Sequence, residues 1–145
     1  MTDTTLHAPG TAQRSLHPFR ALLLAGSVPL FAGVLLSDIA YADTAQVQWK
    51  NFASWLNAGA LLLGGLALLW SVVALIGAAR RHRRSVLAST LLLVGWAFGF
   101  VNSLVHAKDA AATLPEGLML AVLVFALVAV ASVLELATGG PEVRT

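Results

Sequence analysis

Four long apolar stretches divide the chain into alternating hydrophobic and polar segments. They run from Ala21 to about Ser37, from Phe52 to Ala79, from Val86 to Val105 and from Gly117 to Ala137. A helix needs about 20 apolar residues to cross ~30 Å of hydrocarbon, and the first stretch reaches that length when it is extended to Tyr41. Because the stretches are continuous rather than alternating and are rich in Ala and Leu, they predict helices at about 20–41, 52–79, 85–107 and 116–137 rather than strands.

Composition indicates that lipid surrounds these helices. Of the 145 residues, 58% are hydrophobic and 11% are charged, whereas about a quarter of the residues in a soluble domain are charged. In hydrocarbon each backbone N–H and C=O needs a partner inside the protein, and a helix provides one locally. The sequence therefore predicts one all-α integral membrane domain over residues 20–138, with tails at 1–19 and 139–145 and no cleavable signal peptide.

The basic residues predict how the helices are oriented. The two lysines, Lys50 and Lys108, fall in the loops of one side, and the arginines fall in the middle loop and the two tails. The arginines are Arg14, Arg20, Arg80, Arg81, Arg83, Arg84 and Arg144. Because basic loops stay in the cytoplasm, we expect an up-down-up-down four-helix bundle in the bacterial inner membrane with both termini cytoplasmic. We interpret the run at 80–84 as the topogenic signal of its loop, in preference to a nucleic-acid or anionic-lipid patch.

Polar side chains gather where the helices approach the outer, periplasmic side. Asn102, His106 and Asp109 are spaced i, i+4 and i+7, so they share one helix face, and two glycines continue that face deeper into the membrane. We expect this face to point into the bundle, where Asp38 arrives at the same level from the first helix. The candidate cluster at the outer helix ends comprises Asp38, Tyr41, Trp49, Trp55, Asn102, His106 and Asp109.

Three interpretations fit this outer cluster. The leading one is a hydrogen-bonded and ionic latch between the first and third helices, because polar caps near water are common at helix ends. The second is a divalent-metal site that uses His106 with Asp38 or Asp109, whose spacing is not diagnostic of a metal site. The third is a docking surface for a periplasmic partner, although the ordinary aromatic belt of a membrane protein also explains Trp49, Trp55 and Tyr41.

The histidines are poorly placed to hold a b-type haem, which needs two of them at matching depth on facing helices. His17 lies at the inner start of the first helix and His106 at the outer end of the third, so about 20 residues, or roughly 30 Å, separate their levels. His82 lies on the inner side with His17, but within the Arg-rich loop. We therefore predict no resident cofactor, with haem b or a divalent metal as the alternatives.

The sequence contains no motif for catalysis. Cysteine is absent, which removes disulfides, thiolate metal sites and cysteine nucleophiles, and there is no serine triad, phosphate-cradling loop or pair of carboxylates. We therefore predict that the chain is not an enzyme. The Gly95-x-x-x-Gly99 motif allows close helix packing, which we expect within the bundle, with a homo-oligomer through this face as the second option.

Several stretches resemble a bacterial membrane-protein family, the domain of unknown function 2231. The similar stretches are residues 36–41 (LSDIAY), 49–56 (WKNFASWL), 102–110 (NSLVHAKDA) and 114–118 (LPEGL), and the resemblance covers roughly residues 15–140. It implies a four-helix inner-membrane protein with no assigned activity, sometimes found beside genes for periplasmic quinone-dependent dehydrogenases. The chain departs from the family in having only one His-Pro pair, His17-Pro18, and an Arg-rich loop in place of a carboxylate after the second helix.

These patterns predict the partners and the function together. The lipid bilayer is the constant partner, and no nucleic acid is expected. The leading function is that of a structural or accessory subunit whose outer polar cluster supports or docks a periplasmic or membrane protein. The alternative is a haem- or metal-binding electron-transfer subunit linked to a periplasmic quinone-dependent dehydrogenase.

Overall fold

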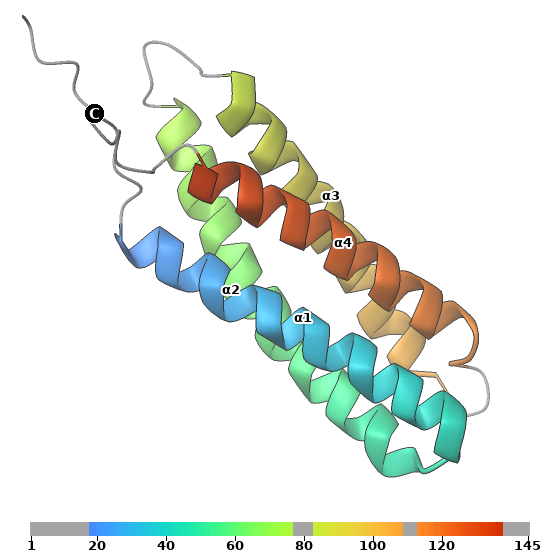
Figure 1. Ribbon diagram of the computed structural model, residues 1–145. Helices are drawn as coiled ribbons and strands as arrows, with labels where there is room; N and C mark the ends of the chain where they lie inside the picture. Colours follow the sequence, from blue (N-terminus) through green and yellow to red (C-terminus); the bar gives the residue numbers. More distant parts are fainter. Residues whose placement is uncertain (1–17, 77–82, 109–112, 138–145) are drawn as a thin grey trace, which may run out of the picture.

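Four α-helices account for most of the residues that the structure describes (Figure 1). The computed structural model describes residues 18–76, 83–108 and 113–137, and within them it contains helices and no strand. The helices are α1 (Pro18–Thr44), α2 (Val47–Ile76), α3 (Arg83–His106) and α4 (Glu116–Ala137). The shortest, α4, has 22 residues and is therefore about 33 Å long at 1.5 Å per residue. All four are long and apolar enough to cross a membrane, which confirms the prediction of four membrane-length helices.

The helices extend further into the polar segments than the apolar stretches predicted. α1 continues to Thr44 instead of ending near 41, and α2 begins at Val47, five residues before Phe52. Backbone hydrogen bonds continue through polar residues at the helix ends, so an apolar stretch marks the hydrocarbon layer rather than the helix. The predicted end of the second helix, at Ala79, lies outside the described residues.

A connection of only two residues, Ala45 and Gln46, joins α1 to α2. Ala45 has a φ of 54°, in the left-handed region, and its N–H donates to the Tyr41 carbonyl at 2.8 Å. This is the geometry of a left-handed helix cap, a position that usually carries glycine. The Thr44 hydroxyl also donates to the Ala40 carbonyl at 2.6 Å, which ties the last turn of α1 to its own backbone.

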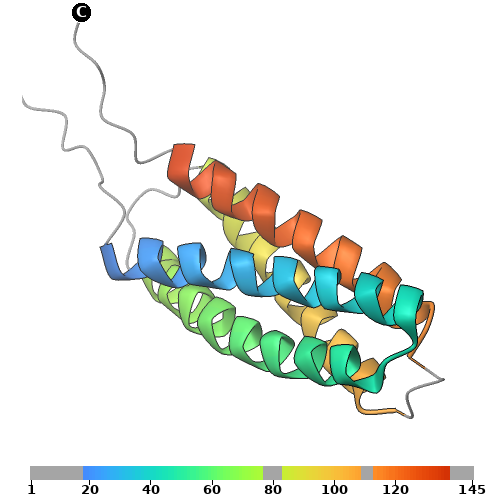
Figure 2. The same ribbon diagram turned by 60° about the horizontal axis from the view of Figure 1, so that its bottom comes forward.

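Each helix packs mainly against two others, so that the four form a ring. α1 contacts α2 and α4, and α3 contacts α2 and α4, with the α1–α2 and α3–α4 pairs the most extensive. Figures 1 and 2 show α1 lying beside α2 along its length, with α3 and α4 forming the second layer. α1 and α3 therefore lie diagonally across the bundle.

Glycines set the closest approaches between the helices. A Cβ on Gly95 of α3 would lie 3.0 Å from Val128 of α4, so the missing side chain lets these two helices approach. A Cβ on Gly65 of α2 would lie 3.0 Å from Trp96 Nε1. The space at Gly65 thus admits the indole of Trp96, whose N–H donates to the Leu61 carbonyl of α2 at 3.0 Å.

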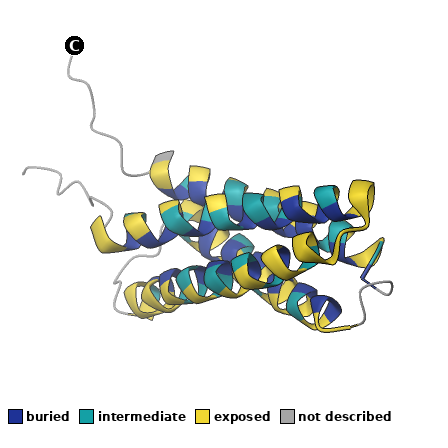
Figure 3. Cartoon of the chain, turned by 90° about the horizontal axis from the view of Figure 1, so that it is seen from below, coloured by how far each residue is buried: buried dark blue, intermediate teal, exposed yellow. Residues whose placement is uncertain are grey.

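The bundle is apolar outside and partly polar inside. Large apolar side chains are exposed along the helices, among them Trp55 at 80% and Ile76 at 75%. Exposed positions follow the outward faces over the full helix lengths in Figure 3, while the buried positions face one another. The side chains of Arg20, Asp38 and Glu135, which are charged in water, are nevertheless buried. A protein that places apolar side chains outside and charged groups inside is suited to lipid, because charge in hydrocarbon must face the interior of the bundle.

Candidate functional site

His106 and Asp38 form a buried contact across the diagonal of the bundle. The distance from His106 Nε2 to Asp38 Oδ1 is 2.8 Å, and both side chains are 1% exposed. The other ring nitrogen, Nδ1, lies 2.9 Å from the Asn102 carbonyl, which can only accept, so Nδ1–H is the donor. One further proton must lie between Nε2 and Oδ1, because two lone pairs would repel at this distance. The pair therefore exists either as imidazolium and carboxylate or as imidazole and carboxylic acid.

The fold makes room for this ring through a glycine in α4. A Cβ on Gly117 would lie 3.3 Å from His106 Cε1 and 3.0 Å from Thr113 Cγ2. His106 is the last residue of α3 and Gly117 the second residue of α4, so the beginning of α4 lies directly against the imidazole. Asp38 reaches Nε2 of the ring from the buried face of α1 that also carries Val34 and Tyr41.

Two asparagines complete this polar layer. Asn57 of α2 donates from Nδ2 to the Gly99 carbonyl at 3.1 Å and to Ser103 Oγ at 2.9 Å, which ties α2 to α3. Asn102 lies one turn below His106 and is 1% exposed. We call Asp38, Asn57, Asn102 and His106 the His106 cluster. Within the described residues, Asp38 Oδ2, Asn57 Oδ1 and both polar atoms of the Asn102 side chain have no hydrogen-bond partner, so the cluster keeps unused hydrogen-bonding capacity.

A second polar cluster lies at the opposite end of the bundle. Arg20 of α1 donates from Nη1 and Nη2 to the two carboxylate oxygens of Glu135 in α4, each at 2.7 Å. Its Nη2 also donates to Ser71 Oγ of α2 at 2.7 Å, and the Ser71 hydroxyl donates to the Ala67 carbonyl. We call Arg20, Ser71 and Glu135 the Arg20 cluster. It joins three helices through one bidentate guanidinium–carboxylate pair, a geometry that fixes both direction and distance.

The structure separates the predicted outer residues into two groups. Asp38, Asn102 and His106 are buried together, and Tyr41 is buried one turn from Asp38. Trp49 and Trp55 lie on exposed positions of α2 outside this group, and the Trp49 ring instead contacts Phe52, with centroids 5.9 Å apart. Three predicted residues lie outside the described residues: Asp109 of the predicted outer cluster, and Arg80 and Arg81 of the basic loop. Arg83 and Arg84 are exposed at the first turn of α3.

Sequence reasoning did not identify the complete Arg20 cluster or the contacts of Asn57. The sequence places Arg20 among the arginines of the inner side and Glu135 as the single carboxylate within the fourth apolar stretch, residues 117–137. A lone carboxylate in a membrane helix is a signal for a basic partner, but the sequence does not tell which of several inner arginines it meets.

The described residues show no ready-made metal or haem site. No three His, Cys, Asp or Glu side chains among them lie close enough to share a metal ion. His106 uses both ring nitrogens in contacts with protein oxygens, so a metal could bind it only by displacing Asp38 or Asn102. The other three histidines, His7, His17 and His82, lie outside the described residues, as does Asp109.

Comparisons with known proteins found no relative. No family model matches the chain, and no curated protein or solved structure matches it. The function must therefore be inferred from the contacts within this chain.

Proposed function

We propose that this chain is a structural or accessory subunit of the bacterial inner membrane, without catalytic activity, whose His106 end supports a periplasmic protein partner. The observation that carries the proposal is the buried Asp38–His106 contact. It joins α1 to α3 across the bundle, with 2.8 Å between Asp38 Oδ1 and His106 Nε2. A buried polar pair that joins diagonal helices restricts how they move against each other. The exposed residues beyond it are thereby presented in one arrangement.

Charge placement supports the proposed orientation. Arg20, Arg83 and Arg84 lie at the end of the bundle where α1 and α3 begin. Lys50 and Lys108 lie at the other end, where the Lys50 ammonium donates to the Lys108 carbonyl at 2.6 Å. With the arginine end in the cytoplasm, the four helices cross the membrane in alternating directions, both termini are cytoplasmic, and the His106 end faces the periplasm.

The exposed surface at the His106 end supports a protein partner there. Trp55 is 80% exposed, and Asp43, Gln48 and Asn51 are exposed around the turn between α1 and α2. Lys108, two residues after the end of α3, and Glu116, the first residue of α4, form a solvent-exposed ion pair at 3.2 Å. Tryptophan is enriched at protein interfaces, which have a polar rim, although Trp55 also suits the membrane interface.

Co-purification from membranes in mild detergent tests the proposed partner. We expect His106→Ala and Trp55→Ala to lose an envelope protein that the unmodified chain retains. Leu62→Ala is the matched control, because Leu62 lies on α2 and is exposed on the apolar surface. Size-exclusion chromatography checks that each variant keeps the size of the parent. If all four proteins retain the same set of partners, the His106 end does not support one.

A haem- or metal-binding electron-transfer subunit is the alternative proposal. It rests on the resemblance to the family named above, to which we propose that the chain belongs, and on His106 as a nitrogen ligand. The occupied ring nitrogens of His106 weigh against it. Absorption in the Soret region and elemental analysis of the purified chain decide the matter, since a colourless, metal-free protein removes this alternative.

A further inference from the structure

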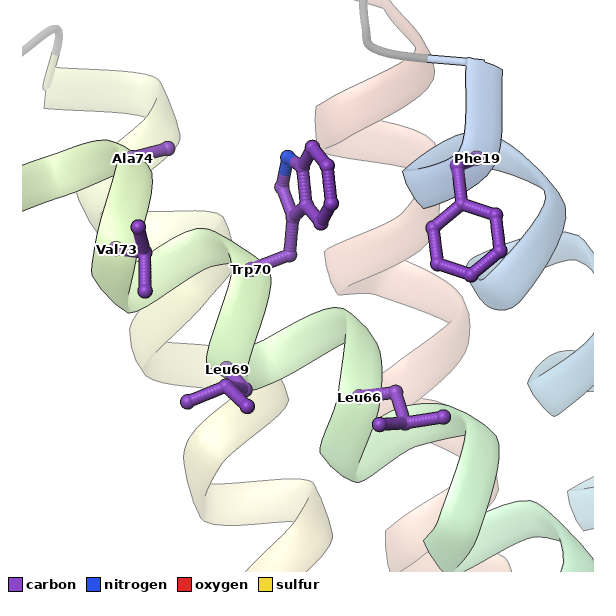
Figure 4. A pocket seen from close by; sticks show the side chains of 6 residues that line it. All are labelled: Phe19, Leu66, Leu69, Trp70, Val73 and Ala74. Atoms are coloured by element: carbon purple, nitrogen blue, oxygen red, sulfur yellow. The ribbon is translucent and has the colours of Figure 1, made fainter.

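A hollow on the outer face of the bundle lies between the beginning of α1 and the second half of α2 (Figure 4). It has a volume of about 520 Å³ and is lined by Phe19, Leu66, Leu69, Trp70, Val73 and Ala74. This volume lies within the range of about 300–1,000 Å³ that is usual for small-molecule sites. Phe19, Leu69 and Val73 are each exposed, so the hollow opens to the outside of the bundle, where lipid chains lie.

A hydrogen bond of the Arg20 cluster and a contact between two aromatic rings join α1 to α2 at this hollow. Phe19 and Trp70 are the chain neighbours of Arg20 and Ser71, which are joined by the hydrogen bond of 2.7 Å. The Phe19 and Trp70 rings lie 5.9 Å apart between centroids and are tilted by 55°. The two rings are therefore in contact with each other and together form one wall of the hollow, with the Arg20–Ser71 hydrogen bond behind it; both rings are labelled in Figure 4.

The dimensions of the hollow suit a lipid acyl chain that enters from the membrane surface. From Leu66 to Ala74 the lining follows α2 over a rise of eight residues, or about 12 Å at 1.5 Å per residue. Ala74 lies two residues before Ile76, at which the described part of α2 ends. Phe19, the second residue of α1, also lines the hollow, so the hollow lies at the end of the bundle where α1 begins.

Positive charge lies at the same end of the bundle. Arg83 and Arg84 are exposed at the start of α3, at the same end of the bundle as the beginning of α1 (Figure 1). Glu135 is the buried carboxylate at this end, and its two oxygens bind Arg20. Among the described residues, the ion pairs given above do not involve Arg83 or Arg84.

We propose that this hollow binds one acyl chain of an anionic phospholipid, whose phosphate headgroup contacts Arg83 and Arg84. The apolar lining takes the acyl chain, and the arginines select the anionic headgroup. Each basic residue near a membrane surface strengthens binding to anionic lipid by about fivefold. The site would make a specific lipid part of the folded protein at its arginine end.

Quenching of Trp70 fluorescence by brominated phospholipid tests the site. The purified full chain in nonionic detergent is titrated with dibrominated phosphatidylglycerol and, separately, with dibrominated phosphatidylcholine. We expect saturable quenching by phosphatidylglycerol at a lower concentration than by phosphatidylcholine, and loss of the saturable part in Trp70→Phe. Replacing Arg83 and Arg84 together by Gln should weaken the phosphatidylglycerol response about 25-fold, at about fivefold for each arginine.

A matched pair of variants separates the hollow from general lipid contact. Ala74→Phe fills the hollow, whereas Ala58→Phe adds the same ring at an exposed position elsewhere on α2. We expect saturable quenching to be lost in Ala74→Phe and retained in Ala58→Phe. The proposal is overturned if the two lipids quench equally, if quenching never saturates, or if Ala74→Phe behaves like Ala58→Phe.

Discussion

The Arg20 cluster and the His106 cluster both join helices through buried polar side chains. They lie at opposite ends of the bundle and use different chemistry. At one end Arg20 and Glu135 form two hydrogen bonds of 2.7 Å, and the guanidinium keeps its charge under all ordinary conditions. At the other end His106 and Asp38 share one proton over a single contact of 2.8 Å. Transfer of this proton from His106 to Asp38 leaves both side chains uncharged, whereas Arg20 and Glu135 cannot lose their charges in this way. A buried contact with a permanent charge depends on its partner more strongly than one whose charge can disappear.

Removing the carboxylate of Glu135 should have the largest effect. Glu135→Ala leaves the Arg20 guanidinium buried without its counter-ion, which typically costs about 3–5 kcal/mol. The free energy of unfolding, measured by titration with SDS in mixed micelles, checks this value.

The double variant Arg20→Met, Glu135→Leu separates lost attraction from uncompensated charge. Replacing a buried ion pair by apolar residues of similar volume is often neutral, so this variant should recover most of the stability lost in Glu135→Ala. If it is as unstable as Glu135→Ala, the pair stabilises the bundle by attraction, and permanent charge is not the reason for the loss.

Removing the carboxylate of Asp38 should lower the free energy of unfolding by less than removing that of Glu135. Asp38→Ala leaves a histidine that can become neutral, so we expect about 1–3 kcal/mol, the cost of an unsatisfied buried polar group. Asp38→Asn should cost less still, because its amide N–H can donate to Nε2 of a neutral ring. The same SDS titration applies, and equal losses in Asp38→Asn and Glu135→Ala would remove the contrast between the two ends.

Gly117→Ala sharpens the comparison by disturbing the His106 cluster without changing its polar groups. The added Cβ would lie 3.0 Å from Thr113 Cγ2 and 3.3 Å from His106 Cε1, so these side chains must shift by a few tenths of an ångström, and overpacking of this kind costs about 1–3 kcal/mol. Gly33→Ala is the control, because its added Cβ meets only the flexible end of Leu56 at 3.0 Å. Nuclear magnetic resonance of the imidazole should show a shift in Gly117→Ala that Gly33→Ala lacks.

The smallest effect is expected at the turn between α1 and α2. Ala45 has a φ of 54°, which glycine adopts more readily than alanine. Ala45→Gly should therefore raise the free energy of unfolding by about 0.5–1 kcal/mol, after the larger flexibility of glycine in the unfolded chain is taken into account. A loss of stability at this position would show that the left-handed turn is not strained.

The four membrane helices were predictable because lipid imposes a long apolar stretch on each of them. The inward face of α3 was predictable too, since Asn102 and His106 are four residues apart beside a glycine stripe. The partners of these residues were not, because Asp38 and His106 are 68 positions apart and Arg20 and Glu135 are 115. Which side chains meet depends on the relative rotation and height of two helices, and apolar periodicity does not fix either.

The most direct test of the account asks on which side of a membrane each end of the bundle lies. The chain contains no cysteine, so Asp43→Cys at the His106 end and Arg84→Cys at the arginine end each give one reactive thiol. Both positions are exposed, and a membrane-impermeant maleimide can reach them if they face the periplasm. We expect Asp43→Cys to react in intact cells and Arg84→Cys to react only after the membrane is opened. Reaction of Arg84→Cys in intact cells, with Asp43→Cys protected, would reverse the orientation and contradict a periplasmic His106 end.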